Sequence, residues 1–243
     1  MRPPGTSIFY PAAIPDLIGV KERRYLDSTG VLQQRNLGDL MRYAAINQGA
    51  DQLSLYGKFR PREPLPEPST QSRYSDAQLY ALALYIYSLK PPPNPNKFDA
   101  LAARGRKVFF SEGCESCHTP PLYTNNSLEP VAGFDFPKEY FRKYAVMDNL
   151  FDTDPSLTLK TRRGTGFYKV PSLKGLWYRG PFEHNGSVAT LEDWFDPRRI
   201  KDDYVPTGFR GSGVETRAVP GHEYGLQLND EERKALIAFL KTL

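Results

Sequence analysis

Both cysteines of the chain lie in one five-residue pattern, Cys114-Glu-Ser-Cys117-His118, within the segment FFSEGCESCHTP at 109–120. Two thiols at this spacing can add across the two vinyl groups of a haem, and the adjacent imidazole can then ligate the iron. The pattern therefore predicts one covalent haem c, with His118 as the proximal iron ligand.

Three other roles are open to the same pattern. A structural zinc site needs four closely spaced ligands, whereas the other two histidines, His184 and His222, are single and far apart in sequence. A thioredoxin-type dithiol needs a preceding strand and has no need of the histidine. A structural disulfide between residues three positions apart is rarer still. The residues therefore favour haem over zinc, dithiol chemistry or a disulfide.

The second axial position of such a haem determines what the iron does. A thioether or imidazole there makes an electron carrier, whereas an open position allows dioxygen or peroxide chemistry. On residue type alone, the candidates are Met147, His184, His222 and several tyrosines. His222 lies in VPGHEYGLQLND, where flanking glycines let the backbone approach a flat ligand closely, although a surface histidine is the alternative.

Helical periodicity marks four segments that must position these residues: 36–48, 75–89, 98–111 and 229–242. Ser75 and Asn229 are suitable N-caps for the second and fourth segments. The third should bury Leu101, Val108 and Phe109, and the fourth should bury a stripe of Leu236, Ile237 and Leu240. No segment has sustained two-residue alternation, so the predicted fold is mainly α.

Proline-rich stretches divide the chain. Pro91–Pro95 marks the best domain boundary, which gives regions 1–95 and 96–243, and Pro61–Pro68 separates the first two helices. The region from Thr119 to Phe195 has few helix signals. Because loops of that length in a compact domain usually surround something, we expect it to wrap a ligand.

Charge and hydropathy exclude two kinds of partner. The 243 residues carry a net charge of +4 without dense runs of Lys or Arg, which disfavours a nucleic-acid partner. The longest apolar run, Leu79–Leu89, is too short to cross a bilayer and is interpreted as a buried helix.

The N-terminal segment MRPPGTSIFYPAAIPDLIG does not have the pattern of a secretory signal, yet haem is attached to Cys-x-x-Cys-His outside the cytoplasm. We therefore expect a periplasmic or otherwise extracytoplasmic location. We also expect the chain to be a fragment, a mis-started reading frame or one polypeptide of a split protein.

Three segments resemble the bacterial dihaem cytochrome c peroxidase superfamily: 105–126 (GRKVFFSEGCESCHTPPLYTNN), 168–195 (YKVPSLKGLWYRGPFEHNGSVATLEDWF) and 221–243 (GHEYGLQLNDEERKALIAFLKTL). The resemblance implies that 96–243 is a cytochrome c-like domain with long ordered loops, of the C-terminal, electron-transferring type. Region 1–95 would then be a helical remnant of the peroxidatic-side domain. No second Cys-x-x-Cys-His occurs in the sequence, so the peroxidatic haem would be absent or lie on an upstream part.

The resemblance also bears on the second axial ligand. Ordinary family members place a methionine a few residues after the Ala-Thr-Leu-Glu segment, and here that position falls near Arg198, which cannot ligate iron while charged. Rubber oxygenase-like members are similar to this chain in having a late histidine, which implies His222. Met147, Tyr204 and an open site remain the alternatives.

The resemblance also implies roles for other residues of segment 168–195. His184 matches the Tyr-Phe-His-x-Gly segment of the family, where it would hold a propionate or its loop, with ordinary loop packing as the alternative. Lys174 and Lys169 would pair with propionates or lie on a solvated surface. The aromatic residues expected around the haem edge are Trp177, Trp194 and Phe182. The carbonyls of Arg179 and Pro181 match positions that help to hold calcium, which makes calcium a further candidate ligand.

The predicted function is electron transfer within a dihaem-peroxidase-like protein, with a redox protein or a second haem domain as partner. One alternative is a peroxidase or oxygenase that acts at a five-coordinate haem, and another is a structural or interaction module of a multi-haem assembly. Peroxidase activity of this chain alone is disfavoured because no Glu or Gln can be assigned to a distal pocket.

Overall fold

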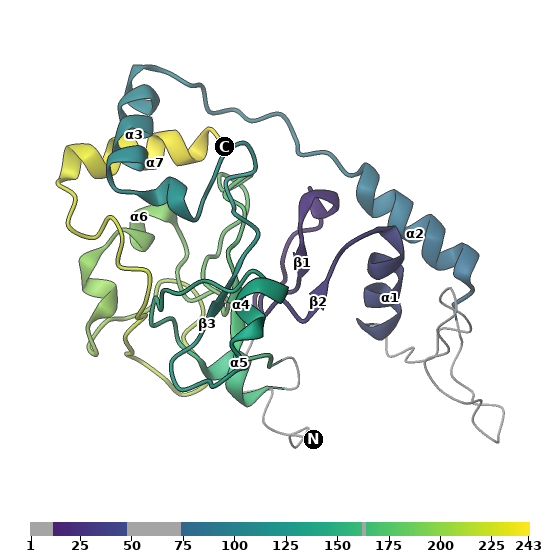
Figure 1. The fold of residues 1–243 in the computed structure, drawn as a ribbon. Coiled ribbons are helices and arrows are strands. Elements are labelled where there is room, and N and C mark those ends of the chain that lie inside the picture. Colours follow the sequence, from purple (N-terminus) through teal and green to yellow (C-terminus); the bar gives the residue numbers. More distant parts are fainter. Residues whose placement is uncertain (1–11, 48–73, 162–163) are drawn as a thin grey trace. The chain divides into compact units, whose positions relative to one another are not determined.

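A computed structural model describes residues 12–47, 74–161 and 164–243 (Figure 1). The proline stretch Pro61–Pro68 and the last residue of the first predicted helix, Gln48, lie outside the described residues. The chain divides into two compact units, and each is described separately. Unit 1 contains the described residues of 12–16, 27–31 and 92–243, and unit 2 contains those of 17–26 and 32–91.

Unit 2 is built around two helices. Its elements are η2 (Val20–Glu22), β1 (Tyr25–Leu26), β2 (Leu32–Gln33), α1 (Leu37–Asn47) and α2 (Asp76–Ser88). The two short strands pair antiparallel, and α1 packs against α2. Ser75 caps α2 through a reciprocal pair of hydrogen bonds with Gln78, as its residue type predicts. Both predicted helices of this unit are confirmed.

The interpretation of 79–89 as a buried helix is wrong for one face of α2. Leu79, Ala83 and Ile86 are buried, whereas Tyr80 and Tyr85 remain 51% and 64% exposed. An apolar run that is continuous in sequence points in every direction around a helix, and the core of unit 2 covers only part of that circumference.

Unit 1 contains the Cys-x-x-Cys-His segment. Its elements are α3 (Ala100–Ser111), η3 (Cys114–Ser116), β3 (Leu128–Pro130), α4 (Glu139–Lys143), α5 (Ser156–Lys160), β4 (Phe167–Lys169), α6 (Leu191–Trp194), η4 (Pro197–Ile200) and α7 (Asp230–Lys241). Asp99 caps α3 and Asn229 caps α7. The mainly helical prediction is confirmed. No helix among the described residues is long and apolar enough to span a bilayer.

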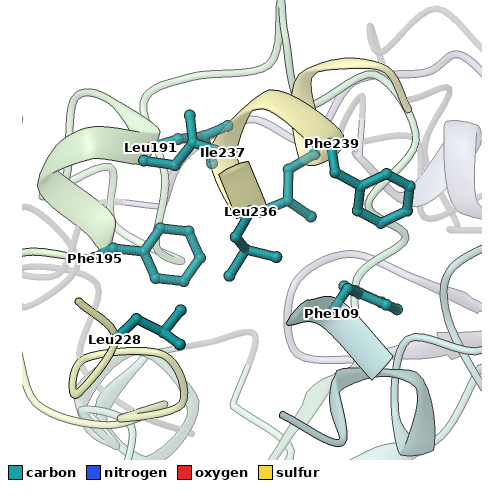
Figure 2. Close-up of a cluster of buried hydrophobic side chains, with 8 residues drawn as sticks. Phe109, Leu191, Phe195, Leu228, Leu236, Ile237 and Phe239 are labelled. Carbon is teal, nitrogen blue, oxygen red and sulfur yellow. The ribbon is translucent and has the colours of Figure 1, made fainter. Parts of the chain in front are cut away.

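Helices α3 and α7 cross, and theirs is the most extensive contact between the described elements of unit 1 (Figure 1). Gly105 allows the crossing, because a β-carbon at this position would overlap the backbone carbonyl group of Ala235. The predicted stripe on α7 is confirmed. On α3 the prediction is confirmed for Phe109, which is buried, and Val108 is partly buried against the core. It is wrong for Leu101, which is 41% exposed, and the helix also buries Ala102 and Gly105. The core cluster beside this crossing is Phe109, Leu191, Phe195, Leu228, Leu236, Ile237, Phe239 and Leu240 (Figure 2).

The region from Thr119 to Phe195, predicted to have few helices, contains three helices of four or five residues and the antiparallel pair β3–β4. Side chains tie its loops to distant backbone. The Thr124 hydroxyl donates to the carbonyl of Val170 at 2.7 Å, and the Ser172 hydroxyl donates to the carbonyl of Leu122 at 2.6 Å. These bonds order the loops without long regular elements.

Strand β3 carries a partly buried carboxyl group. Glu129 accepts a hydrogen bond from the backbone N–H of Phe151 at 3.0 Å. Burial, together with the nearby carboxylates of Glu183 and Asp152, raises the pKa of Glu129 to about 7. The folded protein therefore holds this acid protonated over a pH range in which the unfolded chain ionises it.

A Glu129→Gln variant should be more stable than the parent above pH 7 and should lose that advantage as the pH falls to about 4.5. As the pH rises from about 4.5 to about 7, Glu129 ionises in the unfolded chain but stays protonated in the folded protein, because its pKa in the folded protein is raised. The unfolding free energy of the parent therefore falls over this pH range. The gain at pH 8 should be on the order of 2–3 kcal/mol. Urea unfolding at pH 4, 6 and 8 measures it. Glu215→Gln, at an exposed carboxylate, is the control, and a gain that does not depend on pH would contradict the expectation.

Candidate haem-binding site

The Cys-x-x-Cys-His segment occupies one tight turn after α3. Gly113 has a φ of +72°, a left-handed conformation that glycine adopts without steric cost, and it turns the chain from α3 into η3. The backbone N–H of His118 donates to the carbonyl of Cys114 at 2.9 Å. Cys114 and Cys117 are not joined in a disulfide, and Cys114 packs against the core cluster of unit 1. The turn therefore holds two cysteine side chains and one imidazole close together beside the core cluster of unit 1.

The thiol chemistry of this turn does not suit a redox dithiol. Burial, reinforced by the carboxylates of Glu112 and Glu115, raises the pKa of Cys114 to about 11. A reactive dithiol needs the opposite shift, since the thiolate is the nucleophile. Zinc gains no support either, because within the described ranges no three His, Cys, Asp or Glu side chains gather in a group that could hold a metal.

His118 is held in the tautomer that a metal ligand needs. Its Nδ1 lies 3.1 Å from the carbonyl oxygen of Tyr123. Because a carbonyl oxygen only accepts, Nδ1 carries the proton and Nε2 keeps its lone pair. The residue is 8% exposed, and burial, with a further contribution from His222, lowers the pKa of His118 to about 4. The imidazole is therefore neutral, as metal ligation requires.

The ring of His222 lies close to that of His118. The two ring centroids are 6.2 Å apart, with an angle of 55° between the ring planes. Two imidazoles on opposite sides of one metal ion have centroids roughly 6 Å apart, because each nitrogen lies about 2 Å from the metal and about 1 Å from its ring centre. Nδ1 of His222 is buried and has no hydrogen-bond partner among the described residues. Burial lowers the pKa of His222 as well. These residues fit a haem iron between two neutral imidazoles.

Aromatic rings surround His222. The Trp194 ring lies 5.3 Å away in an edge-to-face arrangement, and the Tyr224 and Phe151 rings lie at 5.6 and 6.4 Å. Of these three, the sequence predicted only Trp194 near the haem. Tyr224 is two residues from His222, but the chain has fifteen tyrosines and fourteen phenylalanines, so an aromatic residue carries little signal by itself.

The His222 loop has an unusual backbone. Gly221 and His222 have φ values of +88° and +49°, and a β-carbon on Gly221 would lie 2.6 Å from Cα of Thr153. The backbone N–H of His222 donates to the carbonyl of Phe151 at 3.1 Å. The glycine before His222 is therefore required for close packing against segment 151–153. The expected close approach of this backbone to a flat ligand stays a prediction.

His184 lies in a different setting. Its ring stacks on Tyr168 with centroids 4.7 Å apart. Its Nδ1 and Nε2 lie 3.4 and 3.9 Å from carboxylate oxygens of Glu183 and Asp154. These anionic neighbours favour loop packing over the holding of a propionate, which is itself anionic. Among the ring contacts of the described residues, His184 meets Tyr168 rather than His118 or His222.

The two lysines and the remaining tryptophan lie at the surface or in loops. Lys174 is exposed, and its backbone carbonyl accepts a hydrogen bond from Arg179 at 2.7 Å. Lys169 is half-exposed at the end of β4. The Trp177 ring contacts Tyr178 edge to face with centroids 4.9 Å apart. Roles for Lys174, Lys169 and Trp177 at a haem edge stay predictions.

The alternative axial ligands lie in other surroundings. Met147 is half-buried, and its backbone N–H donates to the carbonyl of Leu128. Tyr204 is buried against Val188 and Val219. Among the ring contacts of the described residues, His118 is paired with His222 and not with Tyr204.

The remaining predicted positions have local roles. Arg198, where the family's usual ligand was expected, is exposed and pairs with Asp196 at 2.7 Å. Arg179 pairs with Asp16 at 2.7 Å, and Pro181 follows a cis peptide bond. Phe182 contacts Trp194, with ring centroids 6.4 Å apart. The calcium expectation for the carbonyls of Arg179 and Pro181 stays a prediction.

No family model matches the chain. It is similar to methylamine utilization protein MauG of Methylorubrum extorquens, 27% identical over 146 residues, which cover 58% of this chain and 34% of MauG. It is 26% identical over 162 residues to cytochrome-c peroxidase IdrP1 of Denitromonas iodatirespirans, covering 59% of this chain and 40% of that protein. The chain thus spans well under half the length of these curated relatives.

The fold is similar to that of a solved MauG-like protein associated with microbial copper homeostasis. The TM-score is 0.53 at 19% sequence identity, and the alignment covers 96% of this chain and 73% of that one. This likeness supports the mainly helical, cytochrome c-like architecture. Over about 58% of its length, the chain is a distant homologue of the family of dihaem cytochrome c peroxidases and MauG, which uses c-type haem.

Proposed function

We propose that this chain is a c-type cytochrome unit that binds one covalent haem and transfers electrons within a dihaem-peroxidase-like protein. The observation that carries the proposal is the pairing of His118 with His222, whose ring centroids lie 6.2 Å apart. When both axial positions are filled by protein, small oxidants have no free position on the iron, and electron transfer is the remaining chemistry.

The residues of the chain would divide the work as follows. Cys114 and Cys117 would anchor the haem, which supplies a one-electron redox centre when bound. The carbonyl of Tyr123 holds the proton of His118 on Nδ1, so that Nε2 would be free to ligate the iron. His222 would fill the second axial position, and the ring of Trp194 would help to exclude water there. A pair of histidines gives a lower reduction potential than a histidine and a methionine.

The proposed cellular location follows from the chemistry of haem attachment. Because haem is attached to Cys-x-x-Cys-His outside the cytoplasm, the proposal places the protein in the periplasm or another extracytoplasmic compartment. The partner would be a redox protein or a second haem domain. We further propose that 96–243 is the haem domain and 1–95 the remnant of a peroxidatic-side domain.

A His222→Ala variant tests this function. Removal of the imidazole should open the second axial position and convert a low-spin ferric spectrum of the parent into a high-spin one, by optical absorption and EPR. Added imidazole should restore the low-spin signal. His184→Ala, which removes the other non-motif histidine, is the matched control and should keep the parental spectrum. A high-spin parent, or a His222→Ala variant that stays low-spin, would sink the proposal.

A further inference from the structure

Arg199, in η4, is a charged side chain that is completely removed from solvent. It is 0% exposed, whereas its neighbour Arg198 is exposed and paired with Asp196. Burial of a guanidinium group is costly unless hydrogen bonds satisfy it, and burial lowers the pKa of Arg199. A buried arginine in a loop-rich region therefore needs a specific reason.

The guanidinium group uses all three of its nitrogens on backbone carbonyls. Nε donates to Trp194 at 2.8 Å, Nη1 to Val219 at 2.6 Å and Nη2 to His222 at 2.7 Å. The backbone N–H of Val219 donates back to the carbonyl of Arg199 at 2.6 Å. One side chain therefore joins the end of α6 to both ends of the loop 219–222.

Arg199 also restrains the ring beside His222. Its guanidinium carbon lies 5.2 Å from the centroid of the Trp194 ring, and that ring in turn lies 5.3 Å from the His222 ring. A planar guanidinium group can stack on an aromatic face while its edge donates hydrogen bonds, which an ammonium group cannot do in the same way. Arg199 thus restrains His222 in two ways: it binds the backbone carbonyl of His222 directly, and it contacts the Trp194 ring that packs against the His222 side chain.

The backbone of His222 needs such restraint. A residue other than glycine at a φ of +49° adopts a conformation that is uncommon, and it persists where the surrounding structure enforces it. The carbonyl of His222 is held by Arg199 and its N–H by the carbonyl of Phe151. Both peptide groups of the histidine are therefore fixed from outside the loop.

We infer that Arg199 is a positioning residue that holds the imidazole of His222 in place as the second axial ligand. This inference rests on the proposed ligation by His222. In this role Arg199 acts through three carbonyls and the Trp194 ring. Without Arg199, the loop would populate conformations in which the imidazole leaves the axial position.

An Arg199→Met variant of the holoprotein tests the inference, with Arg198→Met as the matched control. Methionine matches the unbranched stem of the arginine side chain but removes every donor. The ferric EPR spectrum of Arg199→Met should acquire a high-spin component. Exogenous imidazole should bind with an apparent Kd at least about tenfold lower than in the parent, because His222 competes less well for the position. Arg198→Met should match the parent in both measurements.

The His222→Ala spectrum separates the two claims. If that variant keeps the parental low-spin spectrum, the proposed function fails. If His222→Ala turns high-spin while folded Arg199→Met keeps the parental spin state and imidazole affinity, the positioning role alone is overturned. If Arg199→Met does not fold, the Arg199→Lys variant is measured instead. Lysine keeps the positive charge but cannot donate to the same three carbonyls from a planar group. An imidazole affinity equal to that of the parent in this variant would overturn the inference.

Discussion

A Cys114→Ser, Cys117→Ser double variant, produced together with haem c attachment machinery, is expected to contain no covalently bound haem. The two cysteines belong to one turn that directly follows α3, and Cys114 packs against the core cluster. Thioether formation needs those thiols, and a serine hydroxyl does not add to a vinyl group under the same conditions. Haem staining of the denatured protein and the mass of the intact chain measure the loss.

Each single serine variant should retain one thioether, and its pyridine haemochrome spectrum should differ from that of the parent. Ser111→Ala, at the exposed end of α3 and outside the pattern, should retain the parental haem content. Covalent haem in the double variant would contradict the assignment. If the parent protein contained stoichiometric zinc and no haem, the Cys-x-x-Cys-His pattern would be interpreted as a zinc site.

A Gly105→Ala variant is expected to lose about 2 kcal/mol of unfolding free energy, and Gly105→Val more. Alanine has the better helix propensity, by about 1 kcal/mol. That gain is outweighed because the added methyl group would overlap the carbonyl of Ala235, which belongs to the backbone of α7 and cannot rotate away. Helices α3 and α7 must then move apart and leave Phe109 and Phe239 less well packed.

Guanidinium unfolding of the holoprotein, followed by far-UV circular dichroism, measures this loss as a lower midpoint at unchanged slope. Lys107→Ala, two residues further along α3 and exposed, is the control and should change the unfolding free energy by less than about 0.5 kcal/mol. A Gly105→Ala variant as stable as the parent would contradict the close crossing of α3 and α7.

The four long helices could be predicted because their signals are local. Ser75 and Asn229 cap their helices with side chains that the sequence displays directly. Leu101 was assigned to the wrong face because α3 packs against the backbone of α7 at Gly105, which has no apolar side chain to contribute to a periodicity. Strands β3 and β4 have three residues each, too few for alternation to be recognised.

In the candidate site, too, the residues of a local sequence pattern could be predicted, whereas those brought together by the tertiary fold were harder to predict. Cys114, Cys117 and His118 form a pattern in five consecutive residues, whereas the proximity of His222 depends on the tertiary fold and was inferred only from a glycine-flanked loop and a resemblance. Arg199 was missed because a charged residue beside Arg198 in Asp-Pro-Arg-Arg suggests a solvated turn. Its burial depends on carbonyls at Val219 and His222, about twenty residues later in the chain.

The separation of His118 and His222 by about a hundred residues has a consequence for the order of assembly. The first three haem-binding residues are complete as soon as one turn forms, but the pairing of the two rings closes a very long loop. Contacts of such high sequence separation form late, because the loop-closure entropy is lost before they contribute stability. If the proposed haem is bound, the spin state of its iron would therefore change only when the segment that carries His222 has docked, and it would report on a late folding step.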